Sequence, residues 1–175
     1  ALVKKFGIKD VREVPYTFNL APFLENKVDV SVAYRMDQVV TLGRKGVQLN
    51  IITPKEYGIN PYGDVIITTE KVLRENPELV RRFVEAAVKS FQWSIEHPDE
   101  AVASLVKNAP DLKPESEVEV WRATIPFLVT DGGITQVGLM KSQRWQETLQ
   151  GLMEFGAIKT SVDLQNAYRD VIQRK

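Results

Sequence analysis

The sequence predicts an α/β protein, with a mostly parallel sheet in the first third and a helix-rich C-terminal part. Up to residue 53, short strand-like segments alternate with short helical ones, and this βαβαβ order favours parallel strands covered by helices. From residue 69 onward, apolar residues recur at helical spacing. Residues 57–64, rich in Gly, Asn and Pro, separate the two regions and form the best candidate boundary.

The first region supplies most of the expected strands. We expect strands over residues 11–16, 28–34, 49–53 and 65–69. The second of these alternates apolar and polar residues, which is typical of a half-buried strand. We expect helices over residues 1–6, 20–26 and 37–44. Gly7 closes the first of these helices, and Asn19 is a candidate cap for the second.

The second region begins its helices with clear local signals. Thr69 precedes a short helix, and Asn76, Pro77 and Glu78 supply a cap, a first-position proline and first-turn acid. That helix is expected to end at His97. Further helices are expected from residue 99, and over residues 115–128, 142–155 and 162–173. Three tryptophans fall on these helical patterns and are expected to be core residues: Trp93, Trp121 and Trp145.

Composition narrows the class of protein. Of 175 residues, 43% are apolar and 26% charged, as expected for a globular protein with a core. Lys and Arg number 23, as do Asp and Glu, so the balance does not indicate a nucleic-acid partner. With no cysteine, disulfides, thiolate nucleophiles and cysteine metal sites are excluded. The chain opens at Ala1 within an expected helix, so we expect it to be the later piece of something longer.

A resemblance lies in the order of several segments. These are LENKVDVSVAY (24–34), GDVIITTEK (63–71), NPELVRRF (76–83) and WSIEHPDEA (93–101). Their succession resembles the NMT1/THI5-like family, the periplasmic-binding-protein-like domains of ABC importers for thiamine-pyrimidine precursors, alkanesulfonates and related compounds. The resemblance implies a partial type 2 periplasmic-binding-protein-like fold.

The resemblance also implies a domain plan. Residues 1–56 would be the remainder of the second lobe, residues 57–64 the hinge, and residues 65–175 a strand plus helices belonging mainly to the first lobe. The first part of the family pattern has no counterpart here, and a lobe lacking a strand has an exposed edge. We therefore expect the 175 residues alone to be marginal, completed by the missing half or by strand exchange in a homodimer.

Ligands of open parallel sheets sit beyond the carboxyl ends of the strands, and three segments fall there. The first contains Thr17, Phe18 and Asn19, where the Asn19 amide can meet a polar ligand. As alternatives, Asn19 only caps the next helix and Phe18 belongs to the core.

The second segment contains Tyr34, Arg35 and Gln38. Many relatives in the resembled family have a Glu at the position of Gln38, and an amide cannot neutralise a cation. Arg35 adds a cationic fork suited to carboxylate, sulfonate or phosphate, which favours an anionic or zwitterionic ligand. The alternative is a solvated helix start with a local ion pair between Arg35 and Asp37.

The third segment is the expected hinge, where Tyr57 and Tyr62 are candidates to stack on a flat ligand ring. The alternative is that both tyrosines brace the hinge by packing. Asp64 is expected to hydrogen-bond turn backbone.

The expected function is the solute-binding component of an ABC importer that captures a small polar or heteroaromatic molecule. The expected partners are that ligand and a membrane permease, in a periplasmic or extracellular location with a lipid anchor on the full-length protein as one option. No catalytic residue, metal or cofactor is expected, because the single histidine, His97, has no ligand set around it. The alternatives are a ligand-sensing module of a signalling protein and a thiamine-pyrimidine biosynthesis enzyme.

Overall fold

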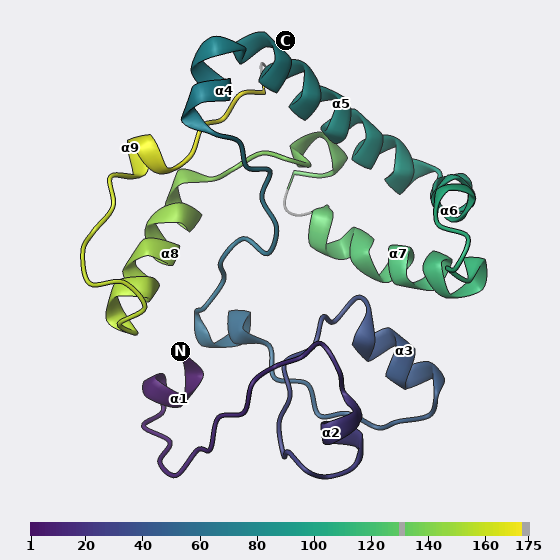
Figure 1. The fold of residues 1–175 in the computed structure, drawn as a ribbon, viewed down its shortest axis with the longest axis vertical. Helices are drawn as coiled ribbons and strands as arrows, with labels where there is room; N and C mark the ends of the chain where they lie inside the picture. The colour runs from purple at the N-terminus through teal and green to yellow at the C-terminus, as the bar shows by residue number, and fades with distance from the viewer. Residues whose placement is uncertain (130–131, 173–175) are drawn as a thin grey trace.

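The described chain is built from helices joined by long irregular connections (Figure 1). It is a computed structural model that describes residues 1–129 and 132–172. In chain order the elements are α1 (Leu2–Lys5), α2 (Ala21–Leu24), α3 (Gln38–Arg44), the 3-10 turn η1 (Pro54–Tyr57), α4 (Glu70–Glu75), α5 (Pro77–Glu96), α6 (Pro98–Asn108), α7 (Pro114–Leu128), the 3-10 turn η2 (Ile134–Gln136), α8 (Ser142–Glu154) and α9 (Leu164–Ala167).

The scaffold is the run of α5, α6 and α7 on the right of Figure 1, where α6 contacts both α5 and α7. Each of these helices begins with proline at its first position, where the missing N–H costs nothing. Val102 on α6 is 3% exposed. Trp121 on α7 donates its indole N–H to the Ser94 carbonyl on α5 over 2.8 Å, which ties the first helix of the group to the last.

Local helix signals predicted most of these boundaries. Thr69 caps α4 by accepting a hydrogen bond from the Val72 N–H over 3.2 Å, as its position indicated. Asn76 precedes α5, but its side chain makes no cap hydrogen bond there, so Pro77 rather than the asparagine amide marks the start. The last helix is much shorter than the expected residues 162–173, because only α9 forms within them; Gln173 lies outside the described residues.

The predicted parallel sheet, and with it the predicted α/β class, is wrong for this structure. Residues 11–16, 28–34, 49–53 and 65–69 run as irregular chain, and no strand is assigned anywhere in 1–129 or 132–172. A strand is held by backbone hydrogen bonds to a neighbouring strand, and these segments form no such ladder within the described residues. Alternating apolar residues indicate that a segment can pack as a strand. The strand forms only where a neighbouring strand offers its backbone hydrogen-bonding groups.

The unpaired segments leave a large apolar surface exposed. Val30 is 74% exposed and Ile67 is 85% exposed. The total accessible surface is 13,604 Å² for 19.8 kDa, whereas a compact monomer of this mass has about 8,600 Å². The apolar side chains of the four expected strands, which a sheet would bury, therefore stay largely exposed to solvent.

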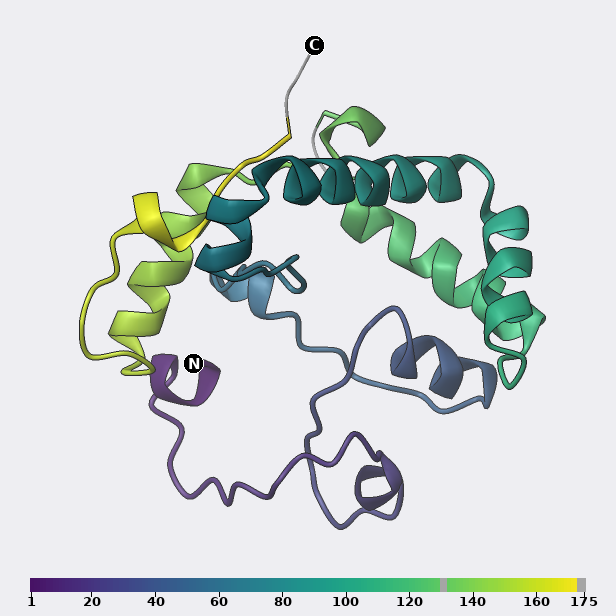
Figure 2. The same cartoon turned by 45° about the horizontal axis from the view of Figure 1, so that its top comes forward.

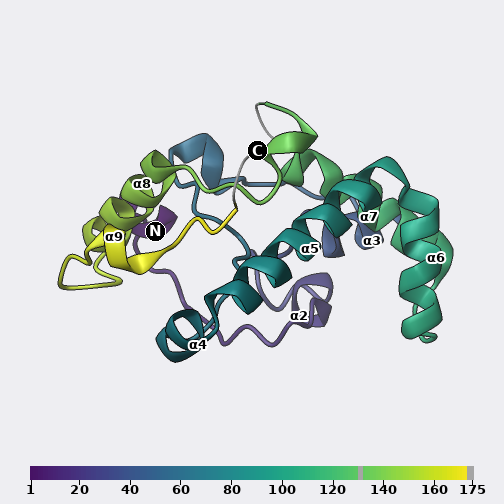
Figure 3. The ribbon, with the colours of Figure 1, turned by 90° about the horizontal axis from the view of Figure 1, so that it is seen from above.

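Residues 1–53 lie below the arch of later helices and meet it at a few points (Figure 2). Arg44 of α3 donates to the Ser116 hydroxyl over 2.8 Å and lies 3.3 Å from a Glu119 carboxylate oxygen, both on α7. Lys4 of α1 donates to the Phe155 carbonyl, just beyond α8, over 2.5 Å. Seen from above, α8 and α9 lie at the opposite end of the molecule from α6 (Figure 3).

Candidate functional site

The first candidate segment, Thr17 to Asn19, leads into α2. The Asn19 side-chain oxygen accepts a hydrogen bond from the Ala21 N–H over 2.9 Å, so this amide serves the start of the helix. Phe18 is 72% exposed and therefore not core. Its φ of 58° lies in the left-handed region that bulky residues rarely adopt, and its ring packs 4.9 Å from the Tyr16 ring. An exposed aromatic ring held in an uncommon backbone conformation is the most distinctive feature of this segment.

The second candidate segment is organised around the start of α3. The Gln38 side-chain oxygen accepts a hydrogen bond from the Tyr34 N–H over 2.6 Å, and the Asp37 N–H bonds to the Tyr34 carbonyl. Gln38 is therefore engaged in shaping its own turn. Arg35 is exposed, and the described residues show no salt bridge between it and Asp37.

Tyr57 and Tyr62, the third candidate pair, pack against different parts of the chain. The Tyr57 ring meets the Phe6 ring edge-on, with centroids 5.2 Å apart. The Tyr62 ring lies 5.6 Å from the Trp145 ring, and its hydroxyl accepts a hydrogen bond from the Lys141 N–H over 2.7 Å. Both tyrosines thus have the bracing contacts that were the alternative to ligand stacking.

Arg144 on α8 is a residue that sequence reasoning missed. Its Nε donates to the Asn60 carbonyl over 2.9 Å, and its Nη2 donates to the Pro61 carbonyl over 2.7 Å and to the Asn60 side-chain oxygen over 3.2 Å. Its guanidinium carbon lies 4.1 Å from the centre of the Tyr62 ring. No local pattern marks Arg144, because its partners lie more than 80 residues earlier in the sequence.

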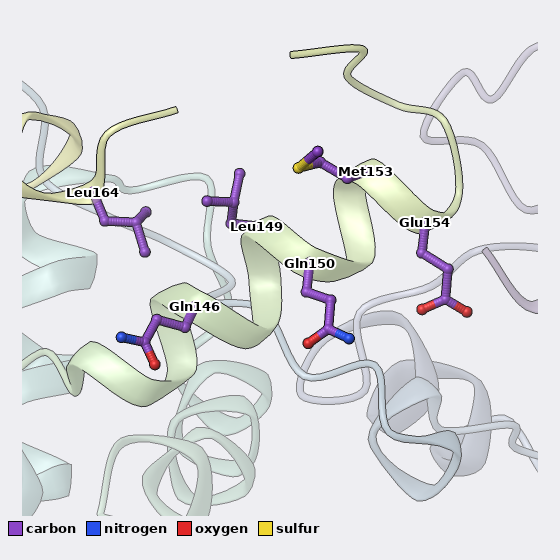
Figure 4. A pocket seen from close by; sticks show the side chains of 6 residues that line it. All are labelled: Gln146, Leu149, Gln150, Met153, Glu154 and Leu164. Carbon is purple, nitrogen blue, oxygen red and sulfur yellow. The ribbon is translucent and has the colours of Figure 1, made fainter. Parts of the chain in front are cut away.

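Two hollows are lined by residues outside all three candidate segments. One, of about 600 Å³, lies along α8 beside the start of α9 (Figure 4); its lining residues are Gln146, Leu149, Gln150, Met153, Glu154 and Leu164. The other, of about 340 Å³, lies among α5, α6 and α7 and includes Phe91, Val102 and Trp121. None of the eight candidate ligand residues lines either of these hollows, and all but Gln38 of α3 and Tyr57 of η1 lie on connecting segments.

Two charged side chains in the first turns of α5, Glu78 and Arg81, have pKa values that differ from their usual ones. Hydrogen bonds from Arg81 hold the pKa of Glu78 below its usual value. Hydrogen bonds to Glu78 and Glu85 in turn raise the pKa of Arg81. This triad stabilises the exposed start of α5 and contacts none of the candidate ligand residues.

The single histidine, His97, is engaged in packing. His97 stacks on Trp93, with ring centroids 4.9 Å apart, and its Nδ1 lies 3.0 Å from the Trp93 carbonyl. In residues 1–129 and 132–172, no group of three or more His, Asp or Glu side chains is placed to hold a metal ion. Within the same residues, no helix combines the length and apolar character needed to cross a membrane.

Comparison with known proteins decides the family. The NMT1/THI5-like family model matches residues 1–101, which is more than half of the chain. The chain belongs to the NMT1/THI5-like family. The match covers α1 to α5 and includes all eight candidate ligand residues.

Two curated relatives match most of this NMT1/THI5-like chain. The riboflavin-binding protein RibY of Chloroflexus aurantiacus is 28% identical over 165 residues, covering 90% of the chain and 46% of RibY. The formylaminopyrimidine-binding protein of Halalkalibacterium halodurans is 23% identical over 155 residues, covering 86% of the chain and 47% of that protein. The chain thus spans about half the length of either relative, and both are named as binding proteins.

Proposed function

We propose that the chain is part of a solute-binding component of an ABC importer, which captures a small heteroaromatic or polar molecule without transforming it. The observation that carries the proposal is membership of the NMT1/THI5-like family together with two relatives named for the small molecules they bind. A permease partner and a periplasmic or extracellular location, with or without a lipid anchor, belong to the same proposal.

The ligand class is proposed from chemistry common to the relatives' ligands. Riboflavin and formylaminopyrimidine both contain a flat, nitrogen-bearing ring, and such rings are bound by stacking on aromatic side chains. Phe18 offers an exposed ring face, with Tyr16 beside it. We assign ring recognition to Phe18 and Tyr34, with Thr17, Asn19 and Gln38 as polar neighbours and Arg35 as the group that meets a negative substituent.

Lobe closure is the proposed mechanism of capture. Residues 1–56 and 65–175 form the two moving parts, and the corner at residues 57–64 joins them. The contacts of Arg44 with Ser116 and Glu119 connect the parts through exposed side chains, so they can be remade as the parts rotate. Closure would bury the ligand and shield it from water.

A binding screen on the full-length protein tests this proposal. Isothermal titration calorimetry with riboflavin, formylaminopyrimidine, a thiamine pyrimidine and an alkanesulfonate is expected to give saturable binding to at least one compound. The bound compound should be recovered unchanged. Absence of binding to the whole set would contradict the proposal, and conversion of a compound would favour the enzyme alternative.

Phe18→Ala is expected to weaken binding of a ring ligand roughly 3- to 10-fold, because an aromatic pair contributes about 0.5–1.5 kcal/mol beyond its buried area. The Kd for riboflavin, measured by quenching of flavin fluorescence, checks this. Phe83→Ala is the matched control, since Phe83 is also an exposed phenylalanine but lies on α5. Equal affinities of the two variants would remove Phe18 from the site.

A further inference from the structure

The corner at residues 57–64 is anchored to different parts of the chain at its two ends. Tyr57, at its start, packs on Phe6 of the N-terminal region. Asn60 and Pro61 receive three hydrogen bonds from Arg144, and Tyr62 is covered by the same guanidinium. Residue 57 is therefore attached to the N-terminal region, whereas residues 60–62 are attached to α8.

Gly58 lies at this change of attachment and has the backbone freedom that a pivot needs. Its φ of 77° is left-handed, and a Cβ atom added there would meet only the Lys5 ammonium, 4.0 Å away. The Gly58 N–H bonds to the Lys55 carbonyl and the Ile59 N–H to the Pro54 carbonyl, so η1 ends at this glycine. Small changes of φ and ψ at Gly58 and Ile59 would rotate the chain from residue 60 onward relative to residues 1–57.

We propose that Arg144 is a positioning residue that makes residues 60–62 one rigid body with α8, so that the two parts of the chain rotate about Gly58 and Ile59. This inference rests on the proposed closure function and narrows the moving corner from eight residues to two. The turn over residues 60–62 travels with α8, and closure leaves its contacts unchanged.

The anchored turn is reinforced by stacked rings beneath it. Tyr62 packs on Trp145, and Trp145 is stacked on Tyr168 with centroids 4.9 Å apart. The Tyr62 hydroxyl also accepts from the backbone N–H of Lys141 at the start of α8. The clamp thus combines a fork of hydrogen bonds, a cation–π contact and two aromatic contacts, whereas Lys4 and Arg44 join the two parts through exposed side chains.

The planar guanidinium is central to this arrangement. Two of its nitrogens donate to oxygens on adjacent residues while its face covers the Tyr62 ring. A lysine ammonium is a point charge and cannot do both in this geometry. Arg144→Lys should therefore fail to restore the clamp, although it keeps the charge and much of the aliphatic stem.

Spin labelling tests the clamp, and a chain without cysteine allows clean labelling. In the full-length protein, with any other cysteines replaced, one label pair joins Asp64→Cys to Gln150→Cys and reports on the clamp. The second pair joins Lys55→Cys to Gln150→Cys and spans the pivot. Without ligand, electron–electron distance measurements are expected to give a narrow distribution for the first pair and a broader one for the second.

Arg144→Ala and Arg144→Lys should both broaden the distribution of the first pair to the width of the second. Arg122→Ala is the control, because Arg122 on α7 forms an exposed ion pair with Asp99 on α6 and contacts neither the corner nor α8. This variant should leave both distance distributions unchanged. The proposal would be overturned if the distance distribution of the first pair stayed narrow in Arg144→Ala, or if it was as narrow in Arg144→Lys as in the protein with Arg144. If Arg144→Ala does not fold, Arg144→Lys decides alone.

Riboflavin titration separates this inference from the proposed function. If the clamp sets the closing geometry, we expect Arg144→Lys to leave about a tenth of the protein able to close. The apparent Kd for riboflavin would then rise about 10-fold, because it is inversely proportional to that fraction. An unchanged Kd alongside a broadened first pair would overturn the positioning role. If the unmodified protein binds no compound, the proposed function fails, while the ligand-free distances still decide whether Arg144 fixes the turn.

Discussion

Purified by itself, the 175-residue chain is expected to associate and to lack a sharp unfolding transition. Its accessible surface exceeds that of a compact monomer by about 5,000 Å². Much of the exposed area lies on segments with strand-like alternation, and unpaired edges of this kind pair with other chains. Size-exclusion chromatography with light scattering, dye binding and thermal melting followed by circular dichroism check the prediction.

The control for this first prediction is the full-length protein under the same conditions. It is expected to be monodisperse, to bind little hydrophobic dye and to melt cooperatively, because the matched region makes up only about half of each relative and the other half could cover such segments. A monomer of 19.8 kDa from the 175-residue chain, with a cooperative transition, would contradict the prediction.

Gly138→Ala is expected to lower the free energy of unfolding of the full-length protein by about 2–5 kcal/mol. Gly138 has a φ of 83°, and an added Cβ would lie 2.5 Å from Cγ2 of Val88 on α5. Left-handed strain on a residue with a Cβ costs about 1–2 kcal/mol, and overpacking about 1–3 kcal/mol more. Urea unfolding monitored by circular dichroism measures the change.

Two other glycines separate strain from steric overlap. Gly46→Ala, just after α3, meets nothing within 4 Å at a φ of 76°, so it should show the strain alone, about 1–2 kcal/mol. Gly43→Ala lies in α3 with open space around it and no left-handed φ, so it should stabilise by about 0.5–1 kcal/mol. Equal losses of unfolding free energy for Gly138→Ala and Gly46→Ala would show that the Val88 contact relaxes freely.

The helices were predictable because their signals are local. Thr69 and Pro77 begin α4 and α5 where their residue types predicted, and α3 lies within the expected residues 37–44. Burial was predicted less well, since Trp93 was expected in the core and is 42% exposed, beside His97. A helical pattern defines a face but does not say what covers it.

The strands and the clamp could not be predicted from local patterns. An apolar alternation such as residues 28–34 becomes a strand only if a second edge supplies hydrogen bonds, and that edge is a long-range property. The contacts of Arg144 with Asn60 and Pro61 are equally long-range. Of the candidate ligand residues, the sequence correctly indicated the alternative roles of Asn19 and Tyr62 but could not choose between capping or bracing and ligand contact.

The ring stack beneath the corner also gives the protein a built-in optical reporter. Trp145 is held between Tyr62 and Tyr168, and its indole N–H is shielded from solvent without a hydrogen-bond acceptor among the described residues. Indole emission is sensitive to polarity and to neighbouring rings, so replacing Trp93 and Trp121 by Phe would leave Trp145 as the one tryptophan of these 175 residues, inside the proposed clamp between residues 60–62 and α8. Because closure is expected to leave the contacts of the clamp unchanged, its wavelength and lifetime should stay constant on ligand binding and shift only when the clamp is opened, as in Arg144→Lys.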